Sequence, residues 1–428
     1  MPKQKGSTVA VIGLGYVGLP LALLAARKGH EVVGIDIDPK KIASINAGVS
    51  PFFDEEITKQ LAKTRLDVDT DFSRVKDSEI VIICVPTPVH EDHSPDLEPL
   101  IRACESIAPH IQKGTLVIVE STVNPGACES VVLPILERIS GMKAGVDFEL
   151  SHCPERVNPG DPKWGVHNIN RVAGSLTKAG LDRTVAFYRS IISGKVQPMK
   201  TIKEAEAVKI IENTFRDVNI AFVNELAMSF DRLGIDILSV LEGAKTKPFA
   251  FLAHYPSCGV GGHCIPVDPY YLIEEGKRNG FNHDFLSLAR KINNSMPVYT
   301  VELLERALRE GGHILSGSKI AVLGLAYKAD IDDMRESPSL RIIEELERRK
   351  AEPVTFDPYV RNRSTARSLT QALTGAAAAI IATNHKEFKQ LTPDYFKKHG
   401  VTVVVDGKNC LAKDDFIASG IVYRGIGR

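Results

Sequence analysis

Short apolar runs alternate with amphipathic segments over the first 150 residues of the chain. The runs predict buried strands, and the segments whose apolar positions recur every three or four residues predict helices. Predicted strands cover residues 8–12, 31–35, 80–85, 115–120 and 148–152, and predicted helices cover about 16–28, 96–111 and 126–140. This alternation is typical of a parallel sheet, whose ligands bind beyond the carboxyl ends of the strands.

The middle of the chain is predicted to be helical. Residues 203 to about 233 contain neither proline nor glycine, which predicts one helix of about 30 residues and about 45 Å. One face carries Lys209, Glu212, Asn213 and Arg216, and an apolar stripe carries Val208, Ile211, Phe215, Val218 and Phe222. A solvated spacer, a dimer interface along the stripe, and oxyanion donors at Lys209 and Asn213 all fit this pattern. Further helices are predicted over 235–245, 269 to about 277, and 284–295.

A second set of alternating elements follows, with predicted strands at 319–323, 353–356, 377–381 and 401–405 and a helix at about 337–349. The first of these strands ends at Gly324, but the later glycines of a dinucleotide loop are missing after it. We therefore expect this half to bind something other than a second dinucleotide. Lys328 and Arg335, in loops at the sheet mouth, are either candidates for binding a diphosphate or ordinary surface cations.

The loop after the first strand reads Gly13-Leu14-Gly15-Tyr16-Val17-Gly18 and opens a helix. In such a fingerprint the first glycine permits a tight turn, the second lets the backbone approach a pyrophosphate, and the third lets helix and strand pack closely. Asp36 lies 18 residues beyond Gly18, where a carboxylate accepts hydrogen bonds from the adenosine ribose. Because a 2′-phosphate would meet like charge there, NAD is predicted over NADP. The alternative is a glycine-rich turn that binds nothing.

These patterns predict an α/β protein with two Rossmann-like doubly wound domains, joined by a long central helix and a small all-α domain. The predicted domains are residues 1–202, which bind NAD, residues 203–312, which are helical, and residues 313–428, which form the second sheet. Polar groups in Pro/Gly-rich loops follow the predicted strand ends at 85–88, 120–126 and 153–160. Thr122 and Glu155 in these loops are either site residues or turn-stabilising side chains.

The composition bears on the class of protein. Lys and Arg number 53, as do Asp and Glu, so net charge gives no general attraction to nucleic acid or to an anionic membrane. No apolar run reaches the roughly 18 residues of a membrane helix, and residues 1–6 form a polar lead-in, not a signal peptide. The seven cysteines include no CxxC pair, and His152-Cys153 has no further ligands at metal spacing. We expect a cytoplasmic protein with reduced thiols and no metal.

One cysteine stands in an unusual stretch, Gly259-Val260-Gly261-Gly262-His263-Cys264, followed by Asp268-Pro269 as a predicted N-cap and first helical residue. The glycines remove bulk beside the thiol, and a helix N-terminus favours the thiolate. Cys264 is therefore a candidate nucleophile. A cysteine without function and an aspartate that only caps the helix are the plainer interpretations.

Over essentially its whole length the chain resembles the UDP-glucose/GDP-mannose dehydrogenase family. The motifs that carry the resemblance are residues 13–20, Glu120-Ser121-Thr122, Cys153-Pro154-Glu155-Arg156, and residues 212–219, 259–269 and 333–338. Residues 153–157 and Phe215-Arg216 are similar to the branch that acts on UDP-N-acetylhexosamines. Residues 244–249, 255–256 and 264–266 look closer to UDP-N-acetylglucosamine 6-dehydrogenases than to UDP-N-acetylmannosamine enzymes. Ser257-Cys258 departs from the Gly-Pro found in many relatives.

The resemblance implies oxidation of a sugar C6 alcohol to a carboxylate by two NAD, through a thiohemiacetal and a thioester on Cys264. It implies that Lys209 and Asn213 stabilise oxyanions, that Asp268 interacts with Lys209 or a water, and that Glu155 with Thr122 positions or deprotonates water. The expected cofactor contacts are Gly13, Gly15, Tyr16, Val17, Gly18, Asp36, Thr87, Thr122 and Arg335. The expected substrate contacts are Glu155, Arg156, Lys209, Asn213, Arg216, Tyr255, Gly261 and Lys328.

The resemblance also implies that residues 313–428 bind the UDP-sugar, that the central helix forms a homodimer, and that the product enters a surface polysaccharide. One alternative is a two-electron 3-hydroxyacid dehydrogenase, which has no use for Cys264. Another is an NAD-binding regulatory protein that has lost its chemistry.

Overall fold

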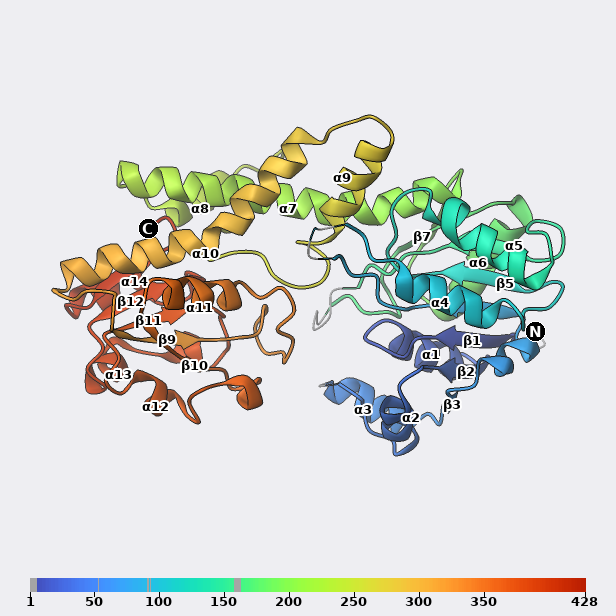
Figure 1. Cartoon of the computed structure of the whole chain (residues 1–428), viewed down its shortest axis with the longest axis horizontal. Coiled ribbons are helices and arrows are strands. Elements are labelled where there is room, and N and C mark those ends of the chain that lie inside the picture. The colour runs from blue at the N-terminus through green and yellow to red at the C-terminus, as the bar shows by residue number, and fades with distance from the viewer. Residues whose placement is uncertain (1–5, 53, 91, 93, 158–162) are drawn as a thin grey trace. The chain divides into compact units, whose positions relative to one another are not determined.

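The structure, a computed structural model, describes residues 6–52, 54–90, 92, 94–157 and 163–428. The chain forms two compact units: the first unit is Met1–Glu212 with Tyr270–Asn282, and the second unit is Asn213–Pro269 with His283–Arg428. Each unit is built around its own sheet (Figure 1). Residues 1–5 of the predicted lead-in and residues 158–160 of the third predicted strand-end loop lie outside the described residues.

The described part of the first unit contains an eight-stranded sheet in the order β3-β2-β1-β4-β5-β6-β7-β8. Its strands are β1 (Thr8–Ile12), β2 (Glu31–Ile35), β3 (Asp67–Asp69), β4 (Ile80–Ile83), β5 (Leu116–Val119), β6 (Glu149–His152), β7 (Arg171–Ser175) and β8 (Val196–Pro198). Its helices include α1 (Gly18–Arg27), α2 (Pro39–Asn46), α3 (Glu55–Leu61), η1 (Phe72–Asp77), α4 (Glu98–Ile107), η2 (Cys128–Val132), α5 (Leu133–Ser140) and α6 (Lys178–Ile191). The order of β3 to β6 is that of the dinucleotide-binding Rossmann fold. Strand β7, which the sequence analysis did not predict, runs antiparallel to β6.

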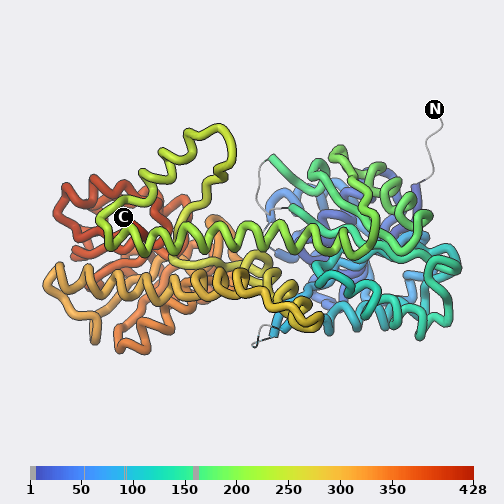
Figure 2. Tube along the Cα trace, turned by 90° about the horizontal axis from the view of Figure 1, so that it is seen from above, coloured from blue at the N-terminus to red at the C-terminus, as the bar shows by residue number. Residues whose placement is uncertain are grey.

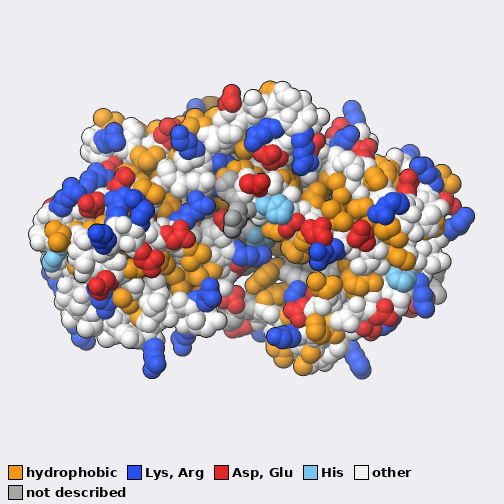
Figure 3. All heavy atoms as spheres, viewed as in Figure 1, with side chains coloured by type: hydrophobic (Ala, Val, Ile, Leu, Met, Phe, Trp, Pro, Cys, Tyr) orange, Lys and Arg blue, Asp and Glu red, His pale blue; other side chains and the backbone are white. Residues whose placement is uncertain are grey.

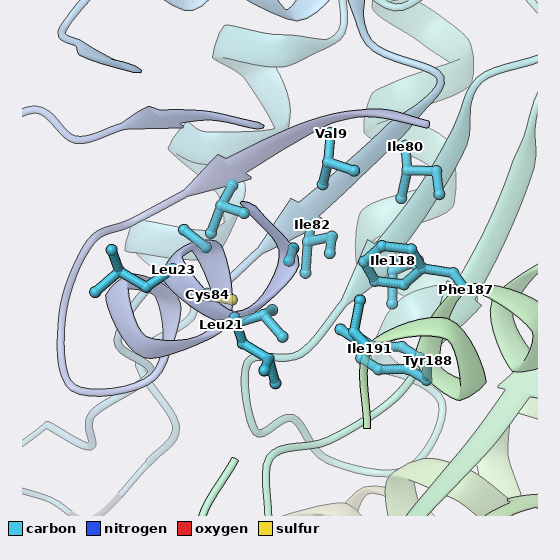
Figure 4. Close-up of a cluster of buried hydrophobic side chains, with 14 of the residues drawn as sticks. Val9, Leu21, Leu23, Ile80, Ile82, Cys84, Ile118, Phe187, Tyr188 and Ile191 are labelled. Carbon is cyan, nitrogen blue, oxygen red and sulfur yellow. The ribbon is translucent and has the colours of Figure 1, made fainter. Parts of the chain in front are cut away.

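Successive residues of the central strands point to opposite faces of this sheet, because side chains alternate along a strand. On one face, residues of β1, β4 and β5 and Cys84, which follows β4, pack with helices α1 and α6 (Figure 4). The labelled members are Val9, Ile80, Ile82, Cys84, Ile118, Leu21, Leu23, Phe187, Tyr188 and Ile191. On the other face, the alternate strand residues, which include Ala10, Val81 and Val117, pack with Leu100 and Ile107 of α4 and Leu136 of α5. Burial on both faces explains why these strands read as continuous apolar runs.

The long helix is confirmed: α7 (Ile202–Leu233) has 32 residues and is unbroken (Figure 2). It is followed by α8 (Ile237–Lys245), α9 (Asp268–Arg278) and α10 (Asp284–Glu310). The prediction that the last of these helices ends at residue 295 is wrong, because α10 continues through Pro297 for 27 residues in all. A proline inside a helix removes one hydrogen bond. Here Met296, Pro297 and Val301 are buried, and this burial outweighs the lost bond.

The described part of the second unit contains a five-stranded parallel sheet in the order β10-β9-β11-β12-β13. Its strands are β9 (Lys319–Leu323), β10 (Glu352–Phe356), β11 (Ala378–Ile381), β12 (Val403–Asp406) and β13 (Val422–Gly425), with α11 (Pro338–Arg348), η3 (Arg361–Arg363), α12 (Leu369–Leu373), η4 (Phe388–Gln390), α13 (Pro393–Lys398) and α14 (Lys413–Ala418). Helices α10 and α11 pack on one face, and α12 to α14 supply apolar side chains to the other. This order is the second common doubly wound arrangement. The prediction of two Rossmann-like sheets with a helical middle is confirmed, and the domain limits at 203 and 313 stay a prediction.

The second sheet contains its own counterpart of Asp36. Asp357 follows β10 and is fully buried, and its Oδ2 accepts hydrogen bonds from Leu325 N (2.6 Å), Ala326 N (2.9 Å) and His385 Nε2 (3.0 Å). His385 Nδ1 accepts from Asp330 N (2.8 Å), which leaves Nε2 as the donor to Asp357. Although burial opposes it, these hydrogen bonds lower the pKa of Asp357 to about 2.

In the described ranges, no helix is both long enough and apolar enough to cross a bilayer. Nor do the described residues include a group of three or more His, Cys, Asp or Glu side chains that could hold a metal ion. On the face shown in Figure 3, basic and acidic side chains are interspersed over the surface of each unit, in keeping with the balanced composition.

Glu206 anchors the first turns of α7 within the first unit. Its carboxylate is fully buried and accepts hydrogen bonds from Gly126 N (2.5 Å) and Cys128 N (2.8 Å). These N–H groups lie at the start of the η2 segment, where a helix cannot satisfy its own donors.

Glu206→Ala is expected to lower the free energy of unfolding by about 1–3 kcal/mol, because it leaves buried N–H groups without an acceptor. Glu225→Ala, at an exposed position of the same helix, should change it by no more than about 0.5 kcal/mol. Urea unfolding followed by circular dichroism compares the two variants. Equal stability of both variants would contradict the anchoring role.

Candidate active site

The glycine fingerprint lies between β1 and α1, and each glycine has a distinct surrounding. Gly13 has a φ of +91°, in the left-handed region that favours glycine. A Cβ on Gly18 would stand 1.9 Å from the carbonyl oxygen of Gly13, so helix and loop can approach only without a side chain there. A Cβ on Gly15 would meet nothing within 4 Å. The loop is therefore open at Gly15, where a pyrophosphate would approach.

The carboxylate of Asp36 is buried at the end of β2 and turned toward this loop. Its Oδ2 accepts hydrogen bonds from Leu14 N (2.8 Å) and from Lys41 Nζ (3.0 Å), and its Oδ1 accepts from Asp38 N (2.9 Å). Lys41 is a residue that the sequence analysis missed. Its position, five residues after Asp36 in the first half of α2, was the available signal.

These residues fit NAD. Helix α1, every residue of which is described, has no acidic residue in its first turn, so the positive end of its dipole is available to phosphate. Tyr16 is 37% exposed and its ring lies 4.1 Å from that of Phe52, centroid to centroid. Val17 is the residue just before α1. When bound, NAD would supply a hydride acceptor.

Two of the predicted strand-end residues meet beyond β4 and β5. Thr87 Oγ1 donates to the carbonyl oxygen of Thr122 (2.7 Å). Tyr271, which is fully buried, donates its hydroxyl hydrogen bond to the carbonyl oxygen of Thr87 (2.7 Å). Thr122 itself is half-buried. This loop pair is therefore held firmly by residues that lie far apart in the sequence.

Glu155 follows β6 and keeps only 8% of its surface exposed. Its Oε1 accepts hydrogen bonds from the backbone N–H groups of Arg156 (2.6 Å) and Val157 (2.7 Å). The Arg156 side chain turns elsewhere and pairs with Glu212 on α7 (Nε to Oε2, 3.1 Å). The Glu155 carboxylate, for which a role is predicted, is thus held in place by backbone hydrogen bonds. The Arg156 guanidinium, also predicted for the site, is already paired with the Glu212 carboxylate.

In the second unit, Cys264 begins a turn that leads directly into α9. Asp268 N donates to the carbonyl oxygen of Cys264 (2.8 Å), and Asp268 is the first residue of the helix, one position earlier than predicted. The Asp268 carboxylate is buried and accepts a hydrogen bond from Asn213 Nδ2 (2.5 Å). Helix α7 therefore holds the residue that closes the Cys264 turn.

The glycines before Cys264 are required by packing. A Cβ on Gly261 would lie 2.7 Å from the Cβ of Tyr327, and one on Gly262 would lie 2.8 Å from the Tyr327 ring. Gly262 also has a φ of +92°, and its N–H donates to the carbonyl oxygen of Arg335 (3.0 Å). The expectation that these glycines clear space beside the thiol is thus incomplete, because they let the loop lie against Tyr327.

The other six cysteines are poor nucleophiles for a common reason. Burial is the main cause that raises the pKa of each of them, namely Cys84, Cys104, Cys128, Cys153, Cys258 and Cys410. Cys264 is partly exposed. Because the thiolate is the reactive form, these surroundings single out Cys264 as the candidate nucleophile.

A chain of buried amides fixes the start of the Cys264 loop. Asn224 on α7 accepts from Ser257 N (3.0 Å) and donates to Asn293 Oδ1 (2.9 Å). Asn293 in turn donates to Asp217 Oδ1 (2.8 Å), which also pairs with Arg290. Asn224 is not among the predicted site residues, although it lies 11 residues after Asn213 and so on the same face of α7.

The remaining predicted site residues belong to several elements of the two units. Lys209 is half-buried on α7, one turn before Asn213, and Arg216 is exposed on the same helix. Tyr255 is 45% exposed and donates to Glu242 (2.7 Å). The Arg335 guanidinium is exposed and paired with Asp333 in the second unit, where Lys328 is half-buried.

The fingerprint loop, the buried Asp36 and the strand order define a dinucleotide-binding α/β protein. The NAD binding domain of the UDP-glucose/GDP-mannose dehydrogenase family matches residues 7–192, its central domain matches 203–295, and its UDP binding domain matches 321–413. The chain belongs to the UDP-glucose/GDP-mannose dehydrogenase family. The predictions of this family and of NAD as cofactor are confirmed.

Full-length relatives support the same assignment. A UDP-N-acetyl-D-mannosamine dehydrogenase of Pyrococcus horikoshii is 40% identical over 98% of this chain and 99% of its own. A UDP-N-acetyl-D-glucosamine 6-dehydrogenase of Pseudomonas aeruginosa is 37% identical over 96% of this chain and 99% of its own. The solved structure of the P. horikoshii UDP-D-ManNAc dehydrogenase matches with a TM-score of 0.92 at 39% identity, over 98% of this chain and 99% of that one.

Gly15→Ala is expected to keep the fold and to weaken NAD binding about tenfold or more, because the new methyl group occupies the side where the pyrophosphate approaches. Gly18→Ala is expected to destabilise the protein by about 1–3 kcal/mol, because its Cβ collides with the Gly13 carbonyl oxygen. Calorimetric titration with NAD and thermal unfolding separate the two effects. Unchanged NAD affinity in Gly15→Ala would contradict the assignment of this loop.

Asn224→Ala is expected to loosen the loop before Cys264, because Ser257 N loses its acceptor and Asn293 loses a partner. Iodoacetamide should then modify Cys264 about threefold faster or more, as measured by peptide mass spectrometry, because local opening exposes the thiol. Asn219→Ala is the matched control on the same helix, where the side chain bonds only locally to Phe215 O. Equal rates in both variants would rule out Asn224 as an anchor.

Proposed function

We propose that this protein oxidises the C6 alcohol of a UDP-N-acetylhexosamine to the carboxylate, with two NAD reduced for each sugar. UDP-N-acetylglucosamine is the substrate suggested by residues 244–249 and 264–266, and UDP-N-acetylmannosamine is the second candidate, supported by the relative from Pyrococcus horikoshii. The observation that carries the proposal is the Cys264 turn, closed by the buried Asn213–Asp268 hydrogen bond.

The thiol explains how an alcohol passes through two oxidations. After the first hydride and proton have left C6, the Cys264 sulfur adds to the aldehyde carbon and the carbonyl oxygen becomes an alkoxide. Loss of a second hydride and collapse of that oxygen give a thioester. Water then attacks the thioester carbon, the carbon–sulfur bond breaks, and the carboxylate is released. One proton of the water returns to the Cys264 sulfur and the other passes to solvent.

The surrounding side chains have complementary roles. Asn213 uses one of its two amide hydrogens on Asp268, and its second can donate to the oxyanion, as can Lys209 one turn earlier. Glu155 and Thr122 would orient the hydrolytic water. Arg156, Arg216, Tyr255, Gly261 and Lys328 are proposed for the substrate, and Tyr16, Val17, Thr87, Asp36 and Arg335 for the cofactor.

Two further features remain proposals. A homodimer through α7 is supported by Phe215 and Phe222, which are 49% and 53% exposed on that helix. A reducing, cytoplasmic setting is supported by the need for Cys264 as a thiol, and all seven cysteines of the chain are thiols here. Entry of the product into a surface polysaccharide rests on the family resemblance.

Cys264→Ser is expected to abolish carboxylate formation and to leave NAD affinity unchanged, because the fingerprint loop is untouched. Wild-type protein should form two NADH for each UDP-sugar consumed, measured by absorbance and by product mass. Cys410→Ser is the matched control at a half-buried thiol that bonds to Asp406. One NADH per sugar in the wild type, or full carboxylate yield from Cys264→Ser, would refute the covalent route. Parallel reactions with both UDP-N-acetylhexosamines decide between the two epimers.

A further inference from the structure

A buried cluster in the first unit shares one guanidinium between two carboxylates. Arg171 is fully buried at the start of β7, where its Nη1 donates to Glu120 Oε1 (2.7 Å) and its Nη2 donates to Glu155 Oε2 (2.5 Å). Glu120 follows β5 and Glu155 follows β6, and these strands are neighbours in the sheet. Because β7 runs antiparallel to β6, its first residue lies at the same edge as the carboxyl ends of β5 and β6.

Hydrogen bonds from other described residues leave Glu155 a single open acceptor position. A carboxylate has about four lone-pair positions. Two are filled on Oε1 by the N–H groups of Arg156 and Val157, and one is filled on Oε2 by Arg171. The remaining position is on Oε2, beside the guanidinium. The orientation of Arg171 therefore decides where a water or hydroxyl can bind to Glu155.

The charges in the cluster do not balance, because one guanidinium faces two carboxylates. The other groups around it are the Tyr188 hydroxyl from α6, which donates to Glu120, and the thiols of Cys84 and Cys153. The Tyr188 ring also lies 4.9 Å from the guanidinium carbon of Arg171. Burial raises the pKa of Glu120 to about 7, with Arg171 opposing the rise and Glu155 adding to it.

We propose that Arg171 is a positioning residue for the Glu155 carboxylate, and that protonation of Glu120, which competes for the same guanidinium, controls how strongly Glu155 is held. The inference rests on the role proposed above for Glu155 in orienting the hydrolytic water. When Glu120 is protonated, Glu155 is the one carboxylate that attracts the positive charge of Arg171. When Glu120 is ionised, the guanidinium is divided and a second negative charge stands nearby.

The pH dependence follows from this competition. Below about pH 7, Glu120 carries its proton, and the guanidinium weakens Glu155 as an acceptor of a hydrogen bond from water. Above that pH, the ionised Glu120 offsets the guanidinium charge and Glu155 becomes the stronger acceptor. Turnover that is limited by thioester hydrolysis should therefore rise with pH through this range.

The central experiment compares the wild type with Glu120→Gln, which keeps the shape of the side chain and removes its titration. Between about pH 6 and 8, kcat should rise about tenfold in the wild type and stay flat in Glu120→Gln. Infrared difference spectra of the same proteins should show a protonated carboxyl band that disappears over this range and is absent in Glu120→Gln. Glu149→Gln is the matched control on β6, where the half-buried carboxylate bonds to Thr177. It should keep both signals.

A second arm tests Arg171 itself. Arg171→Lys keeps the charge but loses the planar fork that reaches both carboxylates, so kcat should fall about tenfold or more with the KM for NAD changed less than about twofold. A wild-type pH profile in Glu120→Gln, or a wild-type kcat in folded Arg171→Lys, would overturn the inference. If Arg171→Lys fails to fold, Glu120→Gln decides alone.

Glu155→Gln separates this inference from the function on which it rests. Wild-type hydrolysis in Glu155→Gln would remove the role of Glu155 itself, and with it the inference. If Glu155→Gln is impaired while Arg171→Lys is fully active, the positioning role of Arg171 alone is overturned and the proposed function stands.

Discussion

The hydrogen bond from Asn213 to Asp268 is the contact on which the second unit depends for its chemistry. It joins the middle of α7 to the residue that closes the Cys264 turn, so the helix fixes where the thiol stands. Asn224 repeats the arrangement about three turns later by accepting from Ser257 N. A loop that has no regular structure between residues 257 and 267 is thereby fixed at both of its ends by one rigid element.

Most of the fold could be predicted from the sequence, because burial on both faces makes the central strands read as apolar runs that loops and amphipathic helices separate. The hydrophobic pattern does not predict an element whose formation depends on tertiary packing. Strand β7 begins with the charged Arg171 and contains only two apolar side chains before Gly174, so it does not read as an apolar run, and it forms by pairing with β6 and β8. Helix α10 passes through Pro297 because the surrounding side chains are buried, which local propensity does not register.

The candidate site divides in the same way. The fingerprint glycines, Asp36 and Cys264 could be found because their chemistry is written in contiguous motifs. Arg171 could not be found, because it acts on carboxylates that are distant in the sequence, and a lone arginine carries no local signature. The helical spacing from Asn213 placed Asn224 on the same face of α7, but nothing in the sequence indicated its partner Ser257. The register of the strands and helices brings these partners together, and it cannot be read from the sequence.

The internal pairing of Asp357 with His385 gives the second sheet a different character from the first. In a nucleotide-binding fold, the carboxylate after the second strand accepts a hydrogen bond from a ribose hydroxyl of the bound nucleotide. Here an imidazole of the chain itself occupies that carboxylate. The C-terminal sheet thus keeps the architecture of its N-terminal counterpart, but the carboxylate that would bind the ribose of adenosine is already bonded to His385. Its loops are therefore free to evolve toward another ligand.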